Sequence, residues 1–441
     1  MSQEKDVDKQ LKDKAIRRHL FYHGKIEIVP KCWISSLDDF SIWYTPGVAA
    51  VCNEIVKDKE KSFDYTLRWN TIAVVSDGTR VLGLGNIGPE AAIPVMEGKA
   101  LIFKYLGGVD AVPICLNTRD EDKIVEVVKF MEPSFGGINL EDIEKPKCFS
   151  VLERLKKQLS IPVWHDDQQG TATVICAGLI NALKLAGKKM KDVKIAMIGA
   201  GAANYSVERL IVKAGIDEKE IVMVDSKGIL NDLRKDLEAN EPYKWKLCLK
   251  TNGERKTGNI AEALNGADVC IAMSRPGPGI IKKEWIKGMS SKAIVFSCAN
   301  PVPEIWPHES KEAGAFIVAT ARGDFPNQLN NSLVFPGIFR GALDVRAKSI
   351  SDGMCLASAR EIAKMAEDNG LTPEYIVPTM EEWEVYPKQA AAVAYQATVE
   401  GLARVKMTQE EELRRAKELI LSSRKKLEVL KQAGLISKPQ H

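Results

Sequence analysis

Residues 194–215 read KIAMIGAGAANYSVERLIVKAG, and this stretch decides the fold of the chain. An apolar run passes through two glycines into an amphipathic segment, and Asp225 ends the next apolar run. The order of strand, glycine turn, helix and acid is typical of a dinucleotide-binding unit, where the pyrophosphate lies on N–H groups at the helix N-terminus. We therefore predict cofactor contacts from Gly199, Gly201, Ala202, Ala203, Asn204 and Asp225.

Two features of this region leave its details open. Asn204 stands where the fingerprint has a third glycine, whose usual role is close packing of the helix on the strand. Asp225 suits the ribose 2′-hydroxyl of NAD, whereas Lys227 in the same DSKG loop would attract the 2′-phosphate of NADP. We expect use of both cofactors, with NAD slightly ahead.

Further apolar runs follow at residues 221–225, 268–273, 293–297 and 316–320, separated by helix-length segments. This alternation predicts a doubly wound parallel sheet of the Rossmann type. Residues 1–160 alternate shorter strand-like runs with helical stretches and predict a smaller N-terminal α/β domain. We place the dinucleotide-binding domain at residues 161–374 and expect helices in about 375–441 to pack on the first domain.

The C-terminal helix has its own start signal, because Thr408 and Glu411 form a capping-box pattern. We interpret this helix as a packing or dimer helix, and we expect a homodimer.

Composition excludes several classes of protein. The 441 residues allow two cores, and a net charge of +3 is far from the basic excess of a nucleic-acid binder. Nine scattered cysteines favour reduced thiols. The first residues mix acids and bases without an apolar run, and no apolar stretch is long enough to span a membrane. We expect a cytoplasmic protein with a small-molecule substrate, and neither nucleic acid nor membrane as partner.

Carboxylates cluster where two strands should end. Glu141 and Asp142 follow one strand-like run, and Asp166 and Asp167 stand between another and a helix. The C-terminal ends of parallel strands face one crevice, where four acids would repel one another unless a cation neutralised them. Mg²⁺ or Mn²⁺ is the hard cation that such oxygen ligands hold. The alternative for the second pair is helix capping, whereas His165 is interpreted as a packing residue.

Two residues are candidates for acid–base chemistry. Tyr44 adjoins the turn Thr45-Pro46-Gly47, which would fix a phenol at a domain surface. Lys99 lies in an apolar helical context, so burial could lower its pKa enough for base chemistry. An ordinary core tyrosine and a lysine that extends to solvent explain the same patterns equally well.

Nine segments together resemble the malic enzyme family over residues 24–344. They are YTPGVA, SDGTRVLGLGNIGPEA, PVMEGKALIF, GGINLED, HDDQQGTA, GAGAAN, DSKG, SCANPVPEI and NNSLVFPGIFRGALD. The length is similar to that of the short, single-module bacterial and archaeal members.

The resemblance implies a role for each matching residue. Tyr44 would be the general acid, Lys99 the general base, and Asp166 the acid that tunes the lysine. Arg80 would hold a malate carboxylate. The metal ligands would be Glu141, Asp142 and Asp167, and contacts to substrate or nicotinamide would come from Asn300, Asn330 and Asn331.

The expected reaction is oxidative decarboxylation of L-malate to pyruvate and carbon dioxide, with reduction of NAD or NADP and a divalent metal. Three alternatives stay open. One is a malolactic conversion of malate to lactate by the same residues, another is a catalytically silent dinucleotide-binding regulatory subunit, and the third is a two-domain dehydrogenase of an amino acid.

Overall fold

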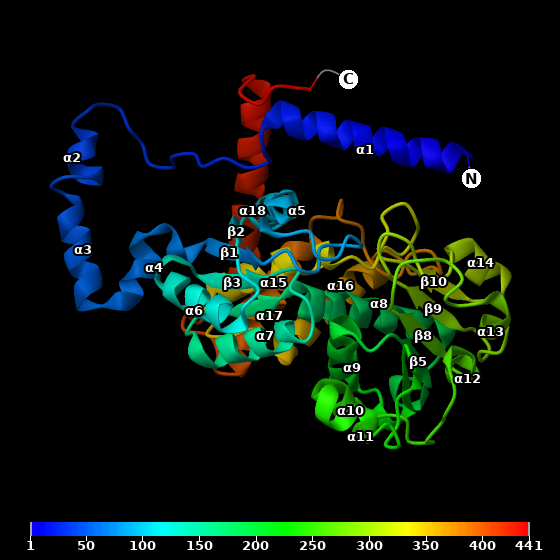
Figure 1. The fold of residues 1–441 in the computed structure, drawn as a ribbon. Helices are drawn as coiled ribbons and strands as arrows, with labels where there is room; N and C mark the ends of the chain where they lie inside the picture. Colours follow the sequence, from blue (N-terminus) through cyan, green and yellow to red (C-terminus); the bar gives the residue numbers. More distant parts are fainter. Residues whose placement is uncertain (1, 440–441) are drawn as a thin grey trace.

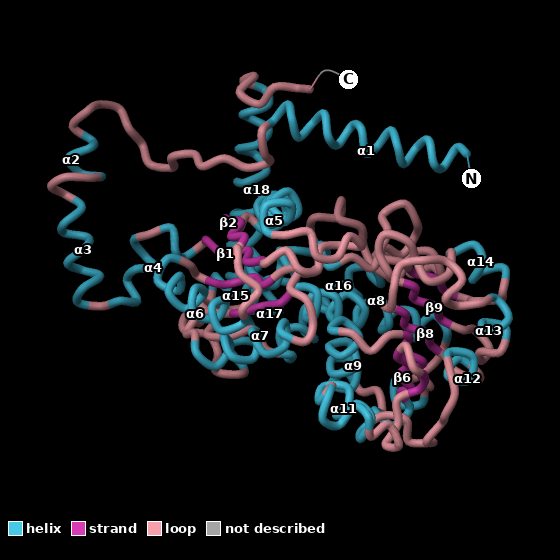
Figure 2. Tube along the Cα trace, in the orientation of Figure 1, coloured by secondary structure: helices cyan, strands magenta, loops and turns pink. Residues whose placement is uncertain are grey.

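The computed structural model describes residues 2–439, and its body is built on two parallel sheets that lie side by side (Figures 1 and 2). The first sheet has the strand order β2-β1-β3-β4, and every pair in it is parallel. Its strands are β1 (Thr71–Ser76), β2 (Asp110–Cys115), β3 (Gly137–Leu140) and β4 (Val163–His165).

The second sheet has the order β10-β9-β8-β5-β6-β7 and is parallel except for the short β7, which pairs antiparallel with β6. This arrangement confirms the predicted Rossmann-type sheet beside a second α/β unit. Its strands are β5 (Ile195–Ile198), β6 (Ile221–Asp225), β7 (Gly228–Ile229), β8 (Val269–Ala272), β9 (Ile294–Ser297) and β10 (Ile317–Ala319).

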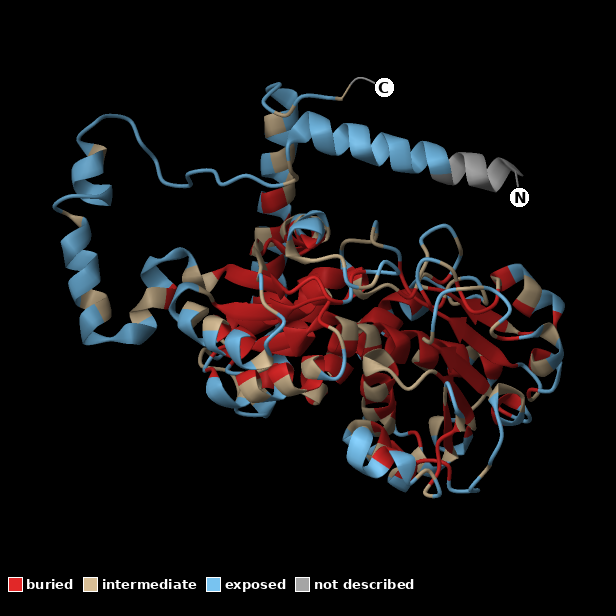
Figure 3. Ribbon diagram, viewed as in Figure 1, coloured by how far each residue is buried: buried red, intermediate tan, exposed pale blue. Residues whose placement is uncertain are grey.

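Most strands of the two sheets are buried on both faces because helices cover the sheets, and Figure 3 shows this burial in the body. Around the first sheet lie α4 (Ser62–Tyr65), α5 (Pro89–Gly107), α6 (Glu121–Met131) and α7 (Lys147–Gln158). The second sheet is accompanied by α9 (Ala202–Ala214), α10 (Asp236–Asn240), α11 (Pro242–Lys250), α12 (Ile260–Leu264), α13 (Lys283–Lys287) and α14 (Pro307–Glu312).

Helix α8 (Thr171–Ala186) joins the two units and is buried along most of its length. It begins directly after a π-helical turn at Asp166–Gly170, and it packs on α9 and on α16 (Asp352–Asp368). The turn that carries Asp166 and Asp167 therefore follows β4 of the first sheet and contacts α9 of the second unit.

Three later helices complete the core against α5, and they are α15 (Phe335–Asp344), α17 (Val385–Val399) and α18 (Gln409–Gln432). The predicted capping box is confirmed, since Thr408 accepts from the Glu411 N–H and Glu411 accepts from the Thr408 N–H. The division of the chain at residues 160 and 374 stays a prediction.

The N-terminal segment forms an arm outside the body. Helices α1 (Ser2–Tyr22), α2 (Asp39–Trp43) and α3 (Val48–Lys57) project away from the sheets (Figure 1). None of the described side chains in the last two helices is buried, and Figure 3 shows most of α2 and α3 in pale blue. Among residues 2–439, no helix is both long and apolar enough to cross a membrane.

Candidate active site

Three carboxylates meet at the C-terminal edge of the first sheet. Glu141 and Asp142 follow β3, and Asp167 follows the neighbouring strand β4. One oxygen of each residue lies within 4.8 Å of an oxygen of the other two, and the Asp142 N–H donates to Asp167 Oδ2 at 3.0 Å. Adjacent parallel strands bring these groups together because their C-terminal ends lie at the same edge.

The electrostatics of this cluster fit a divalent cation. Burial and the negative charges around it raise the pKa of Glu141 well above its ordinary value. The same causes, burial first and then Asp167, raise the pKa of Asp142 to about 8, and Asp142 Oδ2 is buried without a hydrogen-bond partner. A hard cation with oxygen ligands would remove this repulsion and satisfy that oxygen.

Lys99 lies beside the cluster on α5 and is buried. Its Nζ donates to Glu141 Oε1 at 2.7 Å and also to Asp166 Oδ2, and it lies 4.6 Å from the centre of the Phe335 ring. Although burial alone favours the neutral amine, the charges of Asp166 and Glu141 raise the pKa of Lys99. The prediction that burial would lower this pKa is therefore wrong, because the neighbouring acids come from distant parts of the chain.

The π-helical turn after β4 fixes Asp166 against the lysine. Trp164 Nε1 donates to Asp166 Oδ1 at 3.1 Å, so each oxygen of this buried carboxylate has its own donor. Gly170 is required here, since a Cβ on it would lie 2.1 Å from Asp166 Oδ1 and 3.2 Å from Asn331 Cβ. The turn thus holds Asp166 and Asn331 close together, as their predicted shared site requires.

Two residues of this site were missed by the sequence analysis. Asn139 donates its amide to Glu141 Oε2 at 3.0 Å, and Trp164 orients Asp166. Each stands in a strand, two positions before an acid that directly follows that strand, and an extended backbone brings side chains two positions apart to the same face. That spacing was the available signal.

His165 lies next to these acids and is fully buried. Burial lowers its pKa, and neither ring nitrogen has a hydrogen-bond partner among the described residues. Its Nδ1 lies 3.7 Å from Asp167 Oδ2, so it borders the cluster without belonging to the three-carboxylate group.

Three further residues were predicted to contact substrate or nicotinamide, and they are Arg80, Asn300 and Asn330. The Arg80 N–H donates to the Asp142 carbonyl at 3.0 Å, while its side chain is exposed. Asn300, also exposed, is followed by Pro301, and that loop touches the first unit at Gly83, where a Cβ would lie 2.4 Å from Pro301 Cδ. Asn330 uses its side chain to cap a short helical turn by accepting from the Ser332 N–H at 2.9 Å.

Tyr44 is the one predicted catalytic residue that the fold of a single chain leaves apart. It ends α2 on the arm, with 72% of its surface exposed. No hydrogen bond joins its side chain to the body in residues 2–439. The turn beside it lies on this arm and not on the surface of a folded domain.

The dinucleotide turn has the predicted geometry at its glycines. Gly199 has a φ of 103°, and a Cβ on it would lie 2.5 Å from the Met273 carbonyl oxygen. Gly201 precedes α9 at Ala202, and no atom lies within 4 Å of where its Cβ would be. An open space therefore adjoins the helix N-terminus, as a bound pyrophosphate would need.

Asn204 is buried and points into the turn. Its amide donates to the carbonyl oxygens of Ile198 at 3.1 Å and Gly199 at 2.7 Å. It therefore clamps the turn between β5 and α9, which answers how the helix packs without a third glycine.

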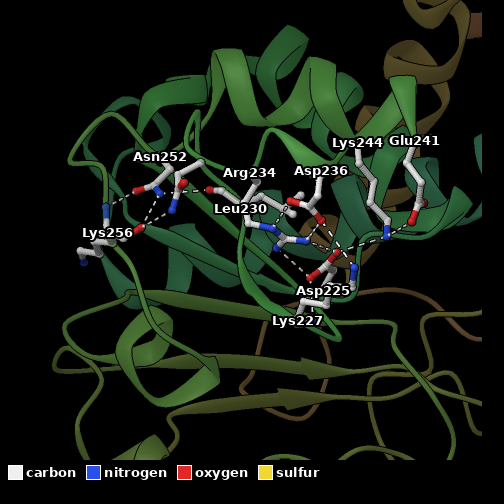
Figure 4. Close-up of polar contacts among 10 residues, drawn as sticks. Asp225, Lys227, Leu230, Arg234, Asp236, Glu241, Lys244, Asn252 and Lys256 are labelled. Atoms are coloured by element: carbon white, nitrogen blue, oxygen red, sulfur yellow. Dashed lines mark hydrogen bonds and ion pairs between the residues drawn. The ribbon is translucent and has the colours of Figure 1, made fainter. Parts of the chain in front are cut away.

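The loop after β6 holds the predicted ribose acid in an ion-pair network (Figure 4). Asp225 accepts from the Lys227 N–H and from two cations that the sequence analysis did not single out, Arg234 and Lys244. The Lys227 amine is exposed and lies 3.5 Å from Asp236 Oδ2.

The fold and the site first define a class: a two-unit α/β protein whose Rossmann-type sheet adjoins a buried lysine–carboxylate cluster. Residues 23–156 match the malic enzyme N-terminal domain, and residues 168–398 match the malic enzyme NAD-binding domain. The chain belongs to the malic enzyme family.

Individual relatives agree with this assignment. The chain is 47% identical to a bifunctional malic/malolactic enzyme of Bacillus subtilis, over 93% of this chain and 99% of that protein. It is 48% identical to an NAD-dependent malic enzyme of Geobacillus stearothermophilus, over 86% and 78% of the two chains. An NADP-dependent malic enzyme of Escherichia coli is 41% identical, with 90% of this chain and 54% of that protein covered.

A solved structure shows the same fold throughout. The malic enzyme of Entamoeba histolytica is 48% identical and superposes with a TM-score of 0.96, over 100% of this chain and 93% of that one.

Proposed function

We propose that the chain oxidises L-malate and removes carbon dioxide from it to yield pyruvate, with NAD or NADP as the acceptor. The observation that supports this most is the contact of Lys99 with Asp166 and Glu141, next to the three-carboxylate cluster. A 2-hydroxy acid needs a group that accepts the hydroxyl proton beside a place where its charge is neutralised.

Mg²⁺ or Mn²⁺ would be held by Glu141, Asp142 and Asp167. When bound, such a cation polarises the oxygens of the hydroxy acid, and the nicotinamide accepts a hydride. Burial favours the neutral amine of Lys99, whereas the charges of Asp166 and Glu141 favour its protonated form. In this proposal the base acts as the neutral amine.

Neutral Lys99 takes the proton from the malate hydroxyl as the hydride leaves the adjoining carbon. Loss of carbon dioxide from the far carboxylate then leaves an electron pair on the neighbouring carbon, and Tyr44 donates the proton that completes pyruvate. Lys99 returns its proton toward Tyr44. Substrate or nicotinamide would be held by Arg80, Asn300, Asn330 and Asn331.

Delivery of Tyr44 requires a second copy of the chain in this proposal. The arm exposes large apolar side chains, including Ile28 at 97%, Trp33 at 82% and Leu37 at 85%. Exposed apolar surface of this kind marks an association surface. We propose a homodimer in which the arm of each chain lies on the other and brings Tyr44 to the partner's Lys99 site.

Mixed dimers test this delivery. Tyr44→Phe and Lys99→Ala chains are co-expressed with different tags, and the dimer holding both tags is purified. Delivery between chains predicts one intact site in each mixed dimer, hence about half of the wild-type turnover from a two-site dimer. If Tyr44 serves its own chain, every site has one defect and the mixed dimer stays as inactive as its parents.

Product analysis tests the reaction itself. The purified chain is incubated with L-malate and Mn²⁺ and with each dinucleotide in turn, and pyruvate, lactate and reduced nicotinamide are measured. Equal amounts of pyruvate and reduced cofactor are expected.

Each alternative predicts a different result. Lactate without net reduced cofactor would favour the malolactic reaction, which the name of the Bacillus relative makes a specific second candidate. Binding of a dinucleotide without any product would indicate a silent regulatory subunit. Preference for an amino acid in a substrate panel would indicate the third alternative.

We also propose that the chain works in the cytoplasm. All nine cysteines are free thiols, six of them buried, which fits a reducing compartment.

A further inference from the structure

Donors from the loop after β6, from the segment after β7 and from α11 occupy every acceptor position of Asp225. Oδ1 accepts from the Lys227 N–H at 2.8 Å and from Arg234 Nη1 at 3.2 Å. Oδ2 accepts from Arg234 Nη2 at 3.4 Å and from Lys244 Nζ at 3.2 Å. An ionised carboxylate offers about four acceptor positions, so no acceptor is left for a ribose hydroxyl unless a donor leaves.

The donors themselves are held in place. Arg234 also donates from Nε and Nη2 to Asp236, at 2.9 and 3.1 Å, and Lys244 donates to Glu241 at 2.7 Å (Figure 4). The exposed fraction of the side chain is 5% for Asp225, 16% for Arg234 and 11% for Lys244. Burial opposes ionisation of Asp225, but these hydrogen bonds hold its pKa below the ordinary value.

The carboxylates of the network are neutralised by neighbouring cations. Asp225, Asp236 and Glu241 face the three cations Arg234, Lys244 and Lys227, and Lys145 lies 3.9 Å from Glu241 at the rim of the network. Lys227 is the exposed member, with 71% of its side chain accessible. It can therefore turn toward an incoming anion, whereas the other two cations stay on Asp225.

We propose that Arg234 is a positioning residue for cofactor choice and makes this pocket accept the 2′-phosphate of NADP. This inference deepens the proposed function, because it assumes that a dinucleotide lies on the β5–α9 turn. Arg234 cancels the charge of Asp225 and occupies both of its oxygens, so the acid neither repels the phosphate nor binds the 2′-hydroxyl. Lys227 then moves from Asp236 to the phosphate.

The decisive variant is Arg234→Gln, which removes the cation and returns acceptor positions to Asp225. The matched control is Arg255→Gln, which removes an arginine that pairs with Asp232 elsewhere in the same unit. Calorimetry measures binding of adenosine 2′,5′-bisphosphate, ADP, NADP and NAD to each metal-free chain, and circular dichroism checks the fold. Binding of isolated probes is independent of turnover.

The wild-type chain should bind adenosine 2′,5′-bisphosphate more tightly than ADP. Arg234→Gln should weaken binding of adenosine 2′,5′-bisphosphate at least about tenfold, because Asp225 without its cation repels phosphate. Binding of ADP should become stronger or stay unchanged, because the free Asp225 oxygens can accept from the ribose. Arg255→Gln should keep the wild-type ratio of the affinities for adenosine 2′,5′-bisphosphate and ADP. Lys227→Ala should weaken only the 2′-phosphorylated ligands, also by about tenfold.

Several results would overturn the inference. A ratio in Arg234→Gln that equals the wild-type ratio, or an equal weakening of both probes, would give Arg234 a structural role only. If Arg234→Gln unfolds, Arg234→Lys replaces it; this variant keeps one charge but cannot hold both Asp225 oxygens, and an unchanged ratio counts in the same way. Failure of the wild-type chain to bind any dinucleotide would refute the proposed function together with this inference.

Discussion

Lys99 and Tyr44, the two candidate proton-transfer groups, stand in opposite surroundings. Lys99 is buried on α5 and bonded to acids that follow β3 and β4, so the body of one chain completes its environment. Tyr44 is exposed at the end of α2, on the arm that leaves the body. The difference teaches that folding of one chain builds the surroundings of Lys99, whereas it leaves Tyr44 without contacts to that site; in the proposed dimer, association supplies this second part.

The largest expected effect lies in the part that one chain builds. Asp167→Asn should lower malate turnover by at least about a thousandfold and weaken Mn²⁺ binding, because the cluster loses one of its three anionic ligands. Titration calorimetry measures Mn²⁺ and dinucleotide binding separately, and dinucleotide affinity should be unchanged. Asp110→Asn, in an ion pair with Lys104 away from the cluster, is the control. An unaltered Mn²⁺ titration in Asp167→Asn would refute the ligand assignment.

A second prediction separates the two groups by the step that each serves. Tyr44→Phe should lower malate turnover by roughly a hundredfold or more, since it removes a general acid. It should nevertheless retain more keto-acid reduction than Lys99→Ala, because hydride transfer needs no proton on the neighbouring carbon. Rates of both reactions are measured for both variants. Equal losses of the two activities in the two variants would contradict this division of roles.

A third prediction concerns the arm as an association surface. Trp33→Ser combined with Leu37→Ser should weaken self-association, because burial of each side chain contributes about 2 kcal/mol. In sedimentation velocity, the variant should dissociate from dimer to monomer at a higher protein concentration than the wild type does. Phe130→Ser removes another exposed apolar side chain, on α6 outside the arm, and should leave association unchanged. The same dimer mass for the arm variant and the wild type would argue against the arm as an interface.

The smallest expected effect is on the free energy of unfolding, in which variants at Lys99 and Tyr44 should differ. Without metal, Lys99→Met leaves buried acids without their cation and should cost about 3 kcal/mol in the unit that contains it. Tyr44→Phe should change stability by less than about 0.5 kcal/mol, since an exposed hydroxyl is lost. Thermal unfolding followed by circular dichroism in the presence of a chelator measures both. A larger shift for Tyr44→Phe would mean that the arm is already part of a folded core.

Much of the fold followed from local patterns. The run that ends at Asp225, the glycine turn at Gly199 and the cap at Thr408 are each set by residues close together in the chain. Their periodicity, backbone freedom and capping bonds act over a few residues, so one sequence suffices to predict them. The proximity of Glu141 and Asp167 followed as well, because parallel strands end at a common edge.

Contacts between distant segments were decided only in three dimensions. Lys99 meets acids 42 and 67 positions away, and those charges raise a pKa that its apolar neighbours in sequence suggested would fall. Asp225 likewise accepts hydrogen bonds from Arg234 and Lys244, which stand nine and nineteen positions further along the chain. No pattern in the DSKG loop indicates these partners.

The sequence by itself thus determined the elements, the glycine turn and the set of reactive groups, since these depend on short-range bonding and on side-chain chemistry. Tertiary structure decided which groups share a charge and which group, Tyr44, stands apart on an exposed arm. The physical reason is that electrostatic interaction and burial depend on distance in space, and a sequence without aligned relatives records distance only along the chain.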